Sequence, residues 1–423
     1  MSRPVYTLLF YCALPLIFLR LWWRARKAPA YRERWRERLA WYDSAPSVHE
    51  GRTVVFHAVS VGETHAAQPL IEKLLQARAD LRVVVTCTTP TGSVRIRELF
   101  GARVEHVYMP YDLPGAVERF LARFDPALLV LLETELWPNL LTACHARGCK
   151  VVLANARLSA RSASRYASHP ALTRSMLDTI DTVVAQAAAD GQRFVSLGLP
   201  GNRLKINGSL KFDMVVNREK VHAARELKAR WRGRPVWIAA STREGEDVKV
   251  LRAFRLAQQQ VPALMLLLVP RHPERFALAA AQARESGFTV QRFSESGNCD
   301  AETQVLVGDT MGDMHFYYAL ADVAFVGGSL VDTGCQNLIE PAAFGLPVLS
   351  GPSLYNFQAV SDLLREKRGM IVVPDEAALA REVVALVKQP EEARVMGECA
   401  RQVVAGNQGA TERLGALILD RIK

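Results

Sequence analysis

The chain has 423 residues, 49% of them hydrophobic, and this length suits two domains of about 150 to 200 residues each. Seven of the ten excess positive charges lie before Asp43, so the basic character is local and favours a membrane surface over nucleic acid, for which no zinc-finger, RNP or helix-turn-helix pattern exists. Seven cysteines without a CxxC pair argue against a disulfide framework and a zinc site, and place the body of the chain in a reducing cytoplasm.

An apolar segment at the N-terminus predicts a membrane anchor. Val5 to Trp23 is interrupted only by Arg20, and at roughly 1.5 Å per residue it reaches about 28 Å, just enough for a bilayer core. A basic cluster follows the segment rather than preceding it, which disfavours a cleaved signal peptide. The positive-inside rule then places the rest of the chain in the cytoplasm. Whether the segment spans the bilayer or only embeds stays open. The cluster consists of Arg24, Arg26 and Lys27.

The next stretch, YRERWRERLAWY from Tyr31 to Tyr42, predicts a basic helix with Trp35 and Leu39 at helical spacing. Such a helix could lie on an anionic leaflet, or it could be a solvated helix with Glu–Arg pairs along its face. Beside a hydrophobic anchor we favour the membrane interpretation.

From Arg52 onward, apolar runs alternate with amphipathic segments, which predicts parallel strands covered by helices. The first series includes TVVFHAV, LRVVVTC, ALLVLLE and KVVLANA, and the second includes PVWIAAS, ALMLLLVP, DVAFVGG and GMIVVP. A charged stretch near Met214 separates the two series. The pattern predicts an α/β protein in which two Rossmann-like, doubly wound domains face across a cleft and bind ligands at the carboxyl ends of their strands.

These features divide the chain into four parts. Residues 1–45 form the anchor and the basic interfacial helix, and residues 46–215 form the first Rossmann-like domain. Residues 216–405 form the second, and residues 406–423 form a C-terminal helix that crosses back to the first.

Candidate catalytic groups follow the strands of the first domain. The loop HAVSVGET, from His57, opens a helix and holds Glu63 in its first turn, where a carboxylate can act as a general base or simply stabilise the helix dipole. His65 is a second candidate base and also an ordinary surface histidine. The motif LETELWPN then ends an apolar strand with Glu133 and Glu135 on one face. Paired acids at a strand end indicate a functional site, and metal binding is one possible role, although no DxD pair is present.

Two further blocks of the first domain bring cations to the same strand ends. NARLSARS, from Asn155, contains Arg157, and GSLKFD, from Gly208, contains Lys211. Both side chains could bind an anionic substrate, or they could be ordinary surface cations.

In the second domain, loops after successive strands carry groups suited to a phosphate. STREGE offers hydroxyls and helix amides, PRHPERF offers a guanidinium, and GDTMGD occupies the equivalent place after a later strand, where its backbone could read a base. The residues that we assign to this ligand are Ser241, Thr242, Pro270, Arg271, Gly308, Met311 and Gly312.

The loop at Gly327, Gly328 and Ser329 completes this predicted pocket. It follows the strand Val323 to Val326 and precedes a predicted helix at Asn337 to Phe344. Free amides and the positive helix end favour an anion, and Glu340 could accept hydrogen bonds from a ribose diol. The stretch therefore predicts a nucleotide-sugar pocket.

Taken in order from His57 to Phe357, these blocks resemble the Kdo (3-deoxy-D-manno-octulosonic acid) transferases, which are lipopolysaccharide enzymes of glycosyltransferase family 30 with the two-domain B-type fold (GT-B). The matching blocks are SVGE, ETELWPN, NARLSARS, GSLKFD, GGS, QNLIEPAAFGLPVLSGP and NF. Two departures concern Arg243, where some members have His, and GCQNLIE, where others read GGHNPLE. They leave the roles of Arg243 and Gln336 open, while Asn337 and Glu340 match.

The resemblance implies an inverting transfer of Kdo from CMP-Kdo to the tetraacyl lipid A precursor, lipid IVA, at the cytoplasmic face of the bacterial inner membrane. Glu63 would take the proton of a glucosamine hydroxyl, and CMP would leave toward Gly327. No metal or other cofactor is expected, because fixed cations and amides can stabilise a leaving group with one phosphodiester. The residues expected to contact the acceptor or shape the active site are Ser60, Gly62, Glu133, Glu135, Arg157 and Lys211.

Two other functions fit the same architecture. A B-type sugar-nucleotide epimerase would have the same sheets but no reason for the anchor. A membrane-tethered nucleotide sensor would bind the sugar nucleotide without turnover. A nicotinamide dehydrogenase is disfavoured, because no strand leads into GxGxxG. The number of Kdo units added, the acyl pattern of the acceptor and the oligomeric state stay open.

Overall fold

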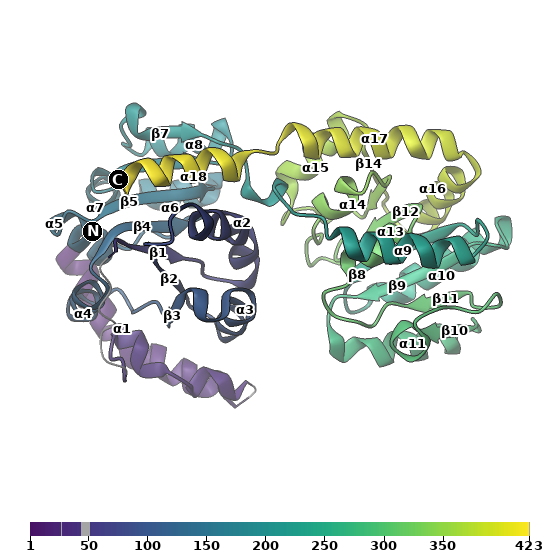
Figure 1. Ribbon diagram of the computed structural model, residues 1–423, viewed down its shortest axis with the longest axis horizontal. Helices are drawn as coiled ribbons and strands as arrows, with labels where there is room; N and C mark the ends of the chain where they lie inside the picture. The colour runs from purple at the N-terminus through teal and green to yellow at the C-terminus, as the bar shows by residue number, and fades with distance from the viewer. Residues whose placement is uncertain (27, 44–50, 423) are drawn as a thin grey trace. The chain divides into compact units, whose positions relative to one another are not determined.

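The computed structural model describes residues 1–26, 28–43 and 51–422, and it divides the chain into two compact units. The first unit combines Met1–Met214 with the C-terminal segment that begins at Gln408, and the second is Val215–Asn407 (Figure 1). Each unit contains one seven-stranded sheet whose paired strands run parallel. The two predicted doubly wound sheets are therefore confirmed.

The sheet of the first unit has the order β3-β2-β1-β4-β5-β6-β7. Its central strands are mostly apolar and are buried on both faces over most of their length, as expected for a parallel sheet covered by helices. The strands are β1 (Thr53–His57), β2 (Arg82–Cys87), β3 (Glu105–Tyr108), β4 (Pro126–Leu132), β5 (Lys150–Ala156), β6 (Thr182–Ala185) and β7 (Leu204–Ile206).

Helices cover both faces of this sheet, and the C-terminal helix α18 (Ala410–Arg421) is one of them. Leu414 and Ile418 of α18 pack into the same core cluster as Leu70 of α2. Asn207, which directly follows β7, donates to the carbonyl oxygen of Ala410 at 2.8 Å. The other helices are α2 (Val61–Ala77), α3 (Pro90–Phe100), α4 (Pro114–Phe124), α5 (Pro138–Ala146), α6 (Ala160–Ala167), α7 (Pro170–Asp178) and α8 (Ala188–Ser196), with 3-10 turns at Gly101–Arg103, Gly201–Arg203 and Leu210–Phe212.

The sheet of the second unit has the order β10-β11-β9-β8-β12-β13-β14. Its strands are β8 (Val236–Thr242), β9 (Met265–Pro270), β10 (Val290–Arg292), β11 (Val305–Val307), β12 (Val323–Val326), β13 (Val348–Ser350) and β14 (Met370–Val372). Its helices are α9 (Arg218–Arg230), α10 (Glu246–Gln260), α11 (Phe276–Glu285), α12 (Phe293–Ser296), α13 (Met314–Leu320), α14 (Ile339–Ala343), α15 (Gln358–Glu366), α16 (Glu376–Lys388) and α17 (Pro390–Gly406), and a 3-10 turn spans Pro273–Arg275.

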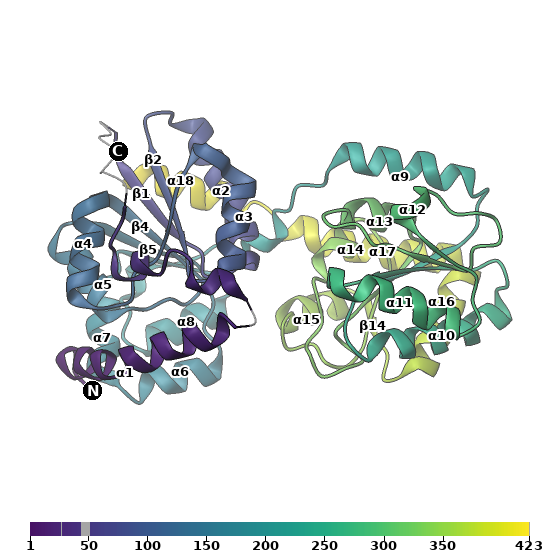
Figure 2. The ribbon, with the colours of Figure 1, turned by 90° about the horizontal axis from the view of Figure 1, so that it is seen from below.

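The apolar N-terminal segment forms one helix, α1 (Arg3–Arg24), with a mean hydropathy of 1.7 over its most apolar window, none of which is buried. It is long and apolar enough to cross a membrane. The helix lies along the outside of the first unit (Figure 2), where the hydroxyl of Thr7 donates to Asn139 at 3.1 Å and the ring of Phe18 lies 6.0 Å from that of Tyr111. Lys27 of the predicted basic cluster is outside the described residues.

The prediction of a continuous basic helix from Tyr31 to Tyr42 was wrong. The segment forms two short 3-10 turns, Pro29–Arg32 and Trp35–Leu39, separated by Arg34 in a left-handed conformation. The cause is tertiary, because the guanidinium of Arg38 lies 4.4 Å from the ring centre of Tyr108, and Arg38 is only 4% exposed. Because Arg38 is buried and the backbone reverses at Arg34, the segment does not present one straight basic face.

Three strands end in residues whose φ is positive, a region that side chains other than glycine seldom adopt. Glu133 follows β4 with φ 58°, Asn155 lies near the end of β5 with φ 51°, and Ser241 lies near the end of β8 with φ 58°. Such strain persists only where surrounding contacts over-determine it. All three positions are at the carboxyl edges of the sheets, where the candidate site residues lie.

Candidate active site

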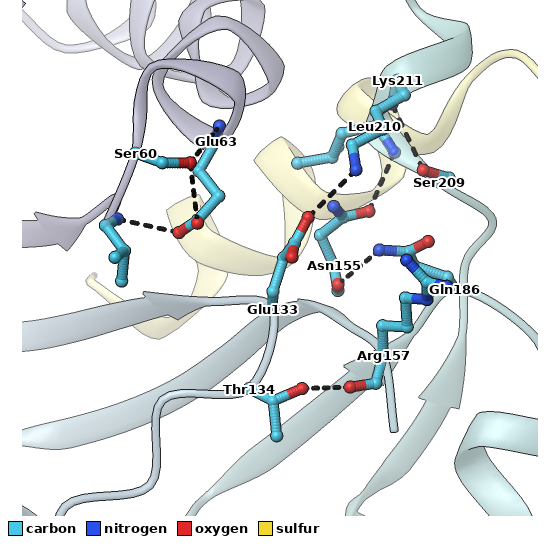
Figure 3. Close-up of polar contacts among 11 residues, drawn as sticks. Ser60, Glu63, Glu133, Thr134, Asn155, Arg157, Gln186, Ser209, Leu210 and Lys211 are labelled. Carbon is cyan, nitrogen blue, oxygen red and sulfur yellow. Dashed lines mark hydrogen bonds and ion pairs between the residues drawn. The ribbon is translucent and has the colours of Figure 1, made fainter. Parts of the chain in front are cut away.

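The first polar cluster lies at the carboxyl edge of the first unit's sheet (Figure 3). Ser60 is the N-cap of α2, and its hydroxyl oxygen accepts from the backbone N–H of Glu63 at 3.5 Å. The carboxylate of Glu63 accepts in return from the backbone N–H of Val59 at 2.8 Å and from the Ser60 hydroxyl at 3.1 Å. These reciprocal contacts with Ser60 and Val59 fix the carboxylate of Glu63 at the sheet edge. Gly62, in the same turn, is exposed.

The ionisation of two carboxyls at this edge is strongly perturbed. Burial, with the charge of Glu133 as a further cause, raises the pKa of Glu63 to about 7. Burial and the charges of Glu63 and Glu133 raise the pKa of Glu135 to about 7. A carboxyl that titrates near neutral pH can accept a proton from a substrate and release it again. Because the charge of Glu133 raises the pKa of Glu135, the predicted pairing of these two acids affects ionisation at this edge.

A cation reaches the same edge from the loop after β7. The ammonium group of Lys211 donates to the carboxylate of Glu133 at 3.1 Å. Asn155 supports this loop, because its side-chain oxygen accepts from the backbone N–H of Leu210 at 3.0 Å while its backbone carbonyl accepts from Gln186 at 2.8 Å. The strained Asn155 therefore links the ends of β5 and β6 to the loop that carries Lys211.

The structure also gives the positions of the other residues in the motifs that predicted this cluster. Arg157 directly follows β5 and is partly buried, and its carbonyl oxygen accepts from the Thr134 hydroxyl. His57, at the end of β1, is fully buried, and burial lowers its pKa to about 3, so it is neutral. The centre of its ring lies 4.8 Å from that of Trp137, with the two planes tilted by 54°. His65 accepts from Arg95 at 3.0 Å on the exposed side of α2.

In the second unit, the Gly327-Gly328-Ser329 loop is buried and its amides already have a partner. The backbone N–H of Gly328 donates to Glu246 at 2.5 Å, and those of Ser329 and Leu330 donate to the same carboxylate at 3.0 and 2.9 Å. The prediction that free amides of this loop receive a phosphate therefore does not fit the structure. The sequence-based interpretation missed Glu246, and the only signal was an acidic residue directly after Gly245.

The helix after this loop is shorter than predicted. α14 spans only Ile339–Ala343, and Asn337 lies just before it, where its side-chain oxygen accepts from the backbone N–H of Ile339 at 3.0 Å. The amide nitrogen of Asn337 donates to the carboxylate of Glu340 at 3.0 Å. Burial raises the pKa of Glu340, and the bond from Asn337 partly opposes this. The structure therefore joins the two predicted residues in one hydrogen-bonded pair.

Two arginines lie near each other at the ends of β8 and β9. Arg271 is exposed, and its side chain donates to Gln336 at 3.3 Å. A guanidinium nitrogen of Arg243 lies 2.5 Å from the ring nitrogen of His272. Burial and the charge of Arg243 lower the pKa of His272. This concentration of positive charge suits an anionic ligand, and it supplies contacts for the two side chains whose roles the sequence left open.

The other predicted ligand residues lie at the same edge of this sheet. Gly308 is buried, and a β-carbon there would lie 2.9 Å from Tyr317, so packing requires glycine. Met311 is 62% exposed, and Gly312 beside it has φ 82°. Of the residues around β8 and β9, Thr242 and Pro270 are buried and Ser241 is partly exposed. Among the described residues, no group of three or more His, Cys, Asp or Glu is placed to hold a metal ion.

Comparison of the sequence with a family model and with curated proteins leads to one family. Residues 33–214 match the family described as 3-Deoxy-D-manno-octulosonic-acid transferase (kdotransferase). The chain is 41% identical to the 3-deoxy-D-manno-octulosonic acid transferase of Haemophilus influenzae over 98% of this chain and 97% of that protein. It is 40% identical to the protein of the same name from Bordetella pertussis over 98% of each chain.

Solved structures with the same fold are more distant. A UDP-GlcNAc 2-epimerase from Neisseria meningitidis covers 87% of this chain and 100% of its own, with a TM-score of 0.58 and 13% identity. A glycosyltransferase from Rickettsia africae covers 88% and 99%, also with a TM-score of 0.58 and 13% identity. At this identity the likeness concerns the fold alone, and it confirms the predicted two-domain B-type architecture.

Proposed function

The chain belongs to the Kdo transferase family of lipopolysaccharide synthesis, and from that premise we propose that it transfers Kdo from CMP-Kdo to the tetraacyl lipid A precursor with inversion at the anomeric carbon. The observation that carries the proposal is Glu63, a carboxyl with a pKa of about 7 that is fixed at the carboxyl edge of the first sheet. Such a group is matched to general-base catalysis near neutral pH.

In the proposed reaction, Glu63 takes the proton from a glucosamine hydroxyl of the acceptor. The hydroxyl oxygen forms a bond to the anomeric carbon of Kdo from the face opposite the phosphate. The bond between that carbon and the phosphate oxygen breaks, and CMP leaves with the electron pair. One carbon–oxygen bond forms as another breaks, and the proton goes to Glu63, so the reaction needs no oxidant or reductant. We also propose that no metal takes part.

The other residues of the first unit would orient the reactants. Lys211, held by Glu133, can contact the carboxylate of Kdo or an acceptor phosphate while it compensates the charge beside Glu63. Glu135, with a pKa of about 7, would be partly protonated at neutral pH and able to donate to a sugar oxygen. Arg157, at the same edge, is the second cation available to an acidic substrate.

In the second unit, we assign donor recognition to the cations and the polar pair rather than to the loop amides. Arg271 and Arg243 supply positive charge for the phosphate. Glu340, oriented by Asn337, can accept from the ribose hydroxyls. Met311 is exposed, and the backbone of its loop can approach the base.

We propose that the protein works at the anionic cytoplasmic face of the inner membrane, with α1 as its attachment. Contacts from Thr7 in the second turn to Phe18 near the end of the helix join α1 to the first unit. A helix held along a cytoplasmic domain over this length supports an orientation embedded in one leaflet rather than across it. Such an attachment would keep the active site close to a lipid substrate.

The proposal is tested with purified protein, CMP-Kdo and lipid IVA, by following CMP release and lipid mass. We expect wild-type protein to add Kdo, Glu63→Gln to lose about 100- to 10,000-fold in turnover, and Glu72→Gln, on the same helix, to retain it. Full activity of Glu63→Gln would overturn the base assignment. A folded wild-type protein that binds CMP but transfers nothing would refute the transferase and favour a nucleotide sensor, whereas rearrangement of the free sugar nucleotide would favour an epimerase.

A further inference from the structure

We propose that Glu246 is a positioning residue that sets the shape of the donor site by accepting hydrogen bonds from the backbone of two of its loops. Glu246 is the first residue of α10, and its side chain is 0% exposed. The inference rests on the proposed function, because it assumes that Arg243 contacts the CMP-sugar and that the Gly327 loop beside it lines the donor site. It assigns to Glu246 an indirect role, with no contact to the donor.

The contacts of Glu246 form a complete acceptor site. One carboxylate oxygen accepts from the backbone N–H groups of Gly328 and Arg243, at 2.5 and 3.0 Å. The other accepts from those of Ser329 and Leu330, at 3.0 and 2.9 Å. Four backbone donors converge on one carboxylate, in the way that a helix end or an amide nest receives a phosphate. The protein thus supplies its own hydrogen-bond acceptor where the sequence pattern suggested a substrate anion.

Close packing leaves this loop little freedom to adopt another shape. A β-carbon on Gly327 would lie 2.7 Å from the α-carbon of Thr242 and 2.8 Å from both the carbonyl oxygen of Ser241 and the carboxylate of Glu246. On the other side, a β-carbon on Gly351 would lie 2.4 Å from the backbone of Ser329. The backbone of the loop is therefore wedged between β8 and the end of β13, and Glu246 determines which way its amides face.

Glu246 also connects the loop to a cation of the site. The N–H bond from Arg243 fixes the backbone of the residue whose guanidinium lies beside His272. A change at Glu246 would therefore displace both the Gly327 loop and Arg243 while leaving every residue of the acceptor cluster untouched. This predicts a selective loss of donor affinity.

The test compares Glu246→Gln with a control at the opposite edge of the same sheet. The glutamine has nearly the same shape, but its NH₂ group would face backbone donors in place of an acceptor oxygen. The control is Asp322→Asn, because the carboxylate of Asp322 accepts from the backbone N–H of Val236 at 2.9 Å, at the amino ends of β8 and β12. Thermal stability, kcat, KM for CMP-Kdo, KM for lipid IVA and the Kd for CMP are measured for each.

We expect Glu246→Gln to raise KM for CMP-Kdo and the Kd for CMP about 10- to 100-fold, with KM for lipid IVA within about twofold of wild type. Asp322→Asn should lower thermal stability and leave both KM values and the Kd for CMP unchanged. The inference would be overturned if Glu246→Gln and wild type had the same KM for CMP-Kdo and the same Kd for CMP. It would also be overturned if KM rose equally for CMP-Kdo and for lipid IVA. If Glu246→Gln does not fold, Glu246→Asp, which keeps the charge on a shorter chain, must show the same selective loss. The CMP measurement decides the question even if wild-type protein transfers no Kdo, so the two proposals fail separately.

Discussion

Replacing Glu63 by glutamine should change how the stability of the protein depends on pH. The pKa of this carboxyl rises from its ordinary value of 4.5 to about 7 in the folded protein, chiefly through burial. A raised pKa means that ionisation disfavours folding. The stabilising contribution of protonated Glu63 is fully present below pH 4.5 and is lost as the pH rises through 7. Glutamine keeps an oxygen acceptor for the backbone N–H of Val59, so this hydrogen bond survives while the titration disappears.

The size of the effect follows from the same pKa. The full shift corresponds to at most about 3 kcal/mol of unfolding free energy, because one pKa unit is about 1.4 kcal/mol. Glu63 is partly exposed, and solvent screening reduces this to about 1 to 2 kcal/mol. Relative to wild type, Glu63→Gln should therefore gain about 1 to 2 kcal/mol between pH 5 and pH 8, or a few degrees in Tm.

The assay is thermal or urea unfolding of the detergent-solubilised full chain at pH 5 and pH 8. Glu72→Gln serves as the control, because Glu72 pairs with Arg103 on the exposed side of the same helix. A difference between Glu63→Gln and wild type that is the same at both pH values would refute the raised pKa. It would also remove the main support for Glu63 as the base.

Three further predictions concern the same cluster and the anchor. Lys211→Met removes a charge that lowers the pKa of Glu63, so the acid limb of the pH profile of kcat/KM should move to higher pH. Lys205→Met is the control and should leave the limb in place. An unmoved limb in Lys211→Met would contradict the electrostatic coupling between Lys211 and Glu63. Asn155→Ala should cost about 1 to 3 kcal/mol in urea unfolding, and Asn155→Gly less, because glycine tolerates the positive φ; equal losses would argue against backbone strain. A protein that lacks residues 3–24 should no longer sediment together with anionic vesicles. Retained binding to the vesicles would exclude α1 as the attachment.

Much of the fold could be predicted because a parallel sheet buries its strands on both faces. The runs TVVFHAV and ALLVLLE are apolar for that reason, and they became β1 and β4. The segment from Tyr31 to Tyr42 could not be predicted in the same way, because its conformation depends on Tyr108, far along the chain. Helical spacing alone favoured a helix that tertiary contacts replaced with 3-10 turns.

The order of residues along the chain determined which side chains come to the carboxyl edge of each sheet, since every parallel strand ends there. For this reason the sequence alone predicts that Glu63, Glu133 and Lys211 lie at one edge. Only the tertiary structure decided their ionisation, because a pKa depends on burial and on charges brought from distant segments. The same holds for the Gly327 loop. Its amides were visible in the sequence, but their partner, Glu246, lies 82 residues away from Gly328 and is brought there by the pairing of β8 with β12.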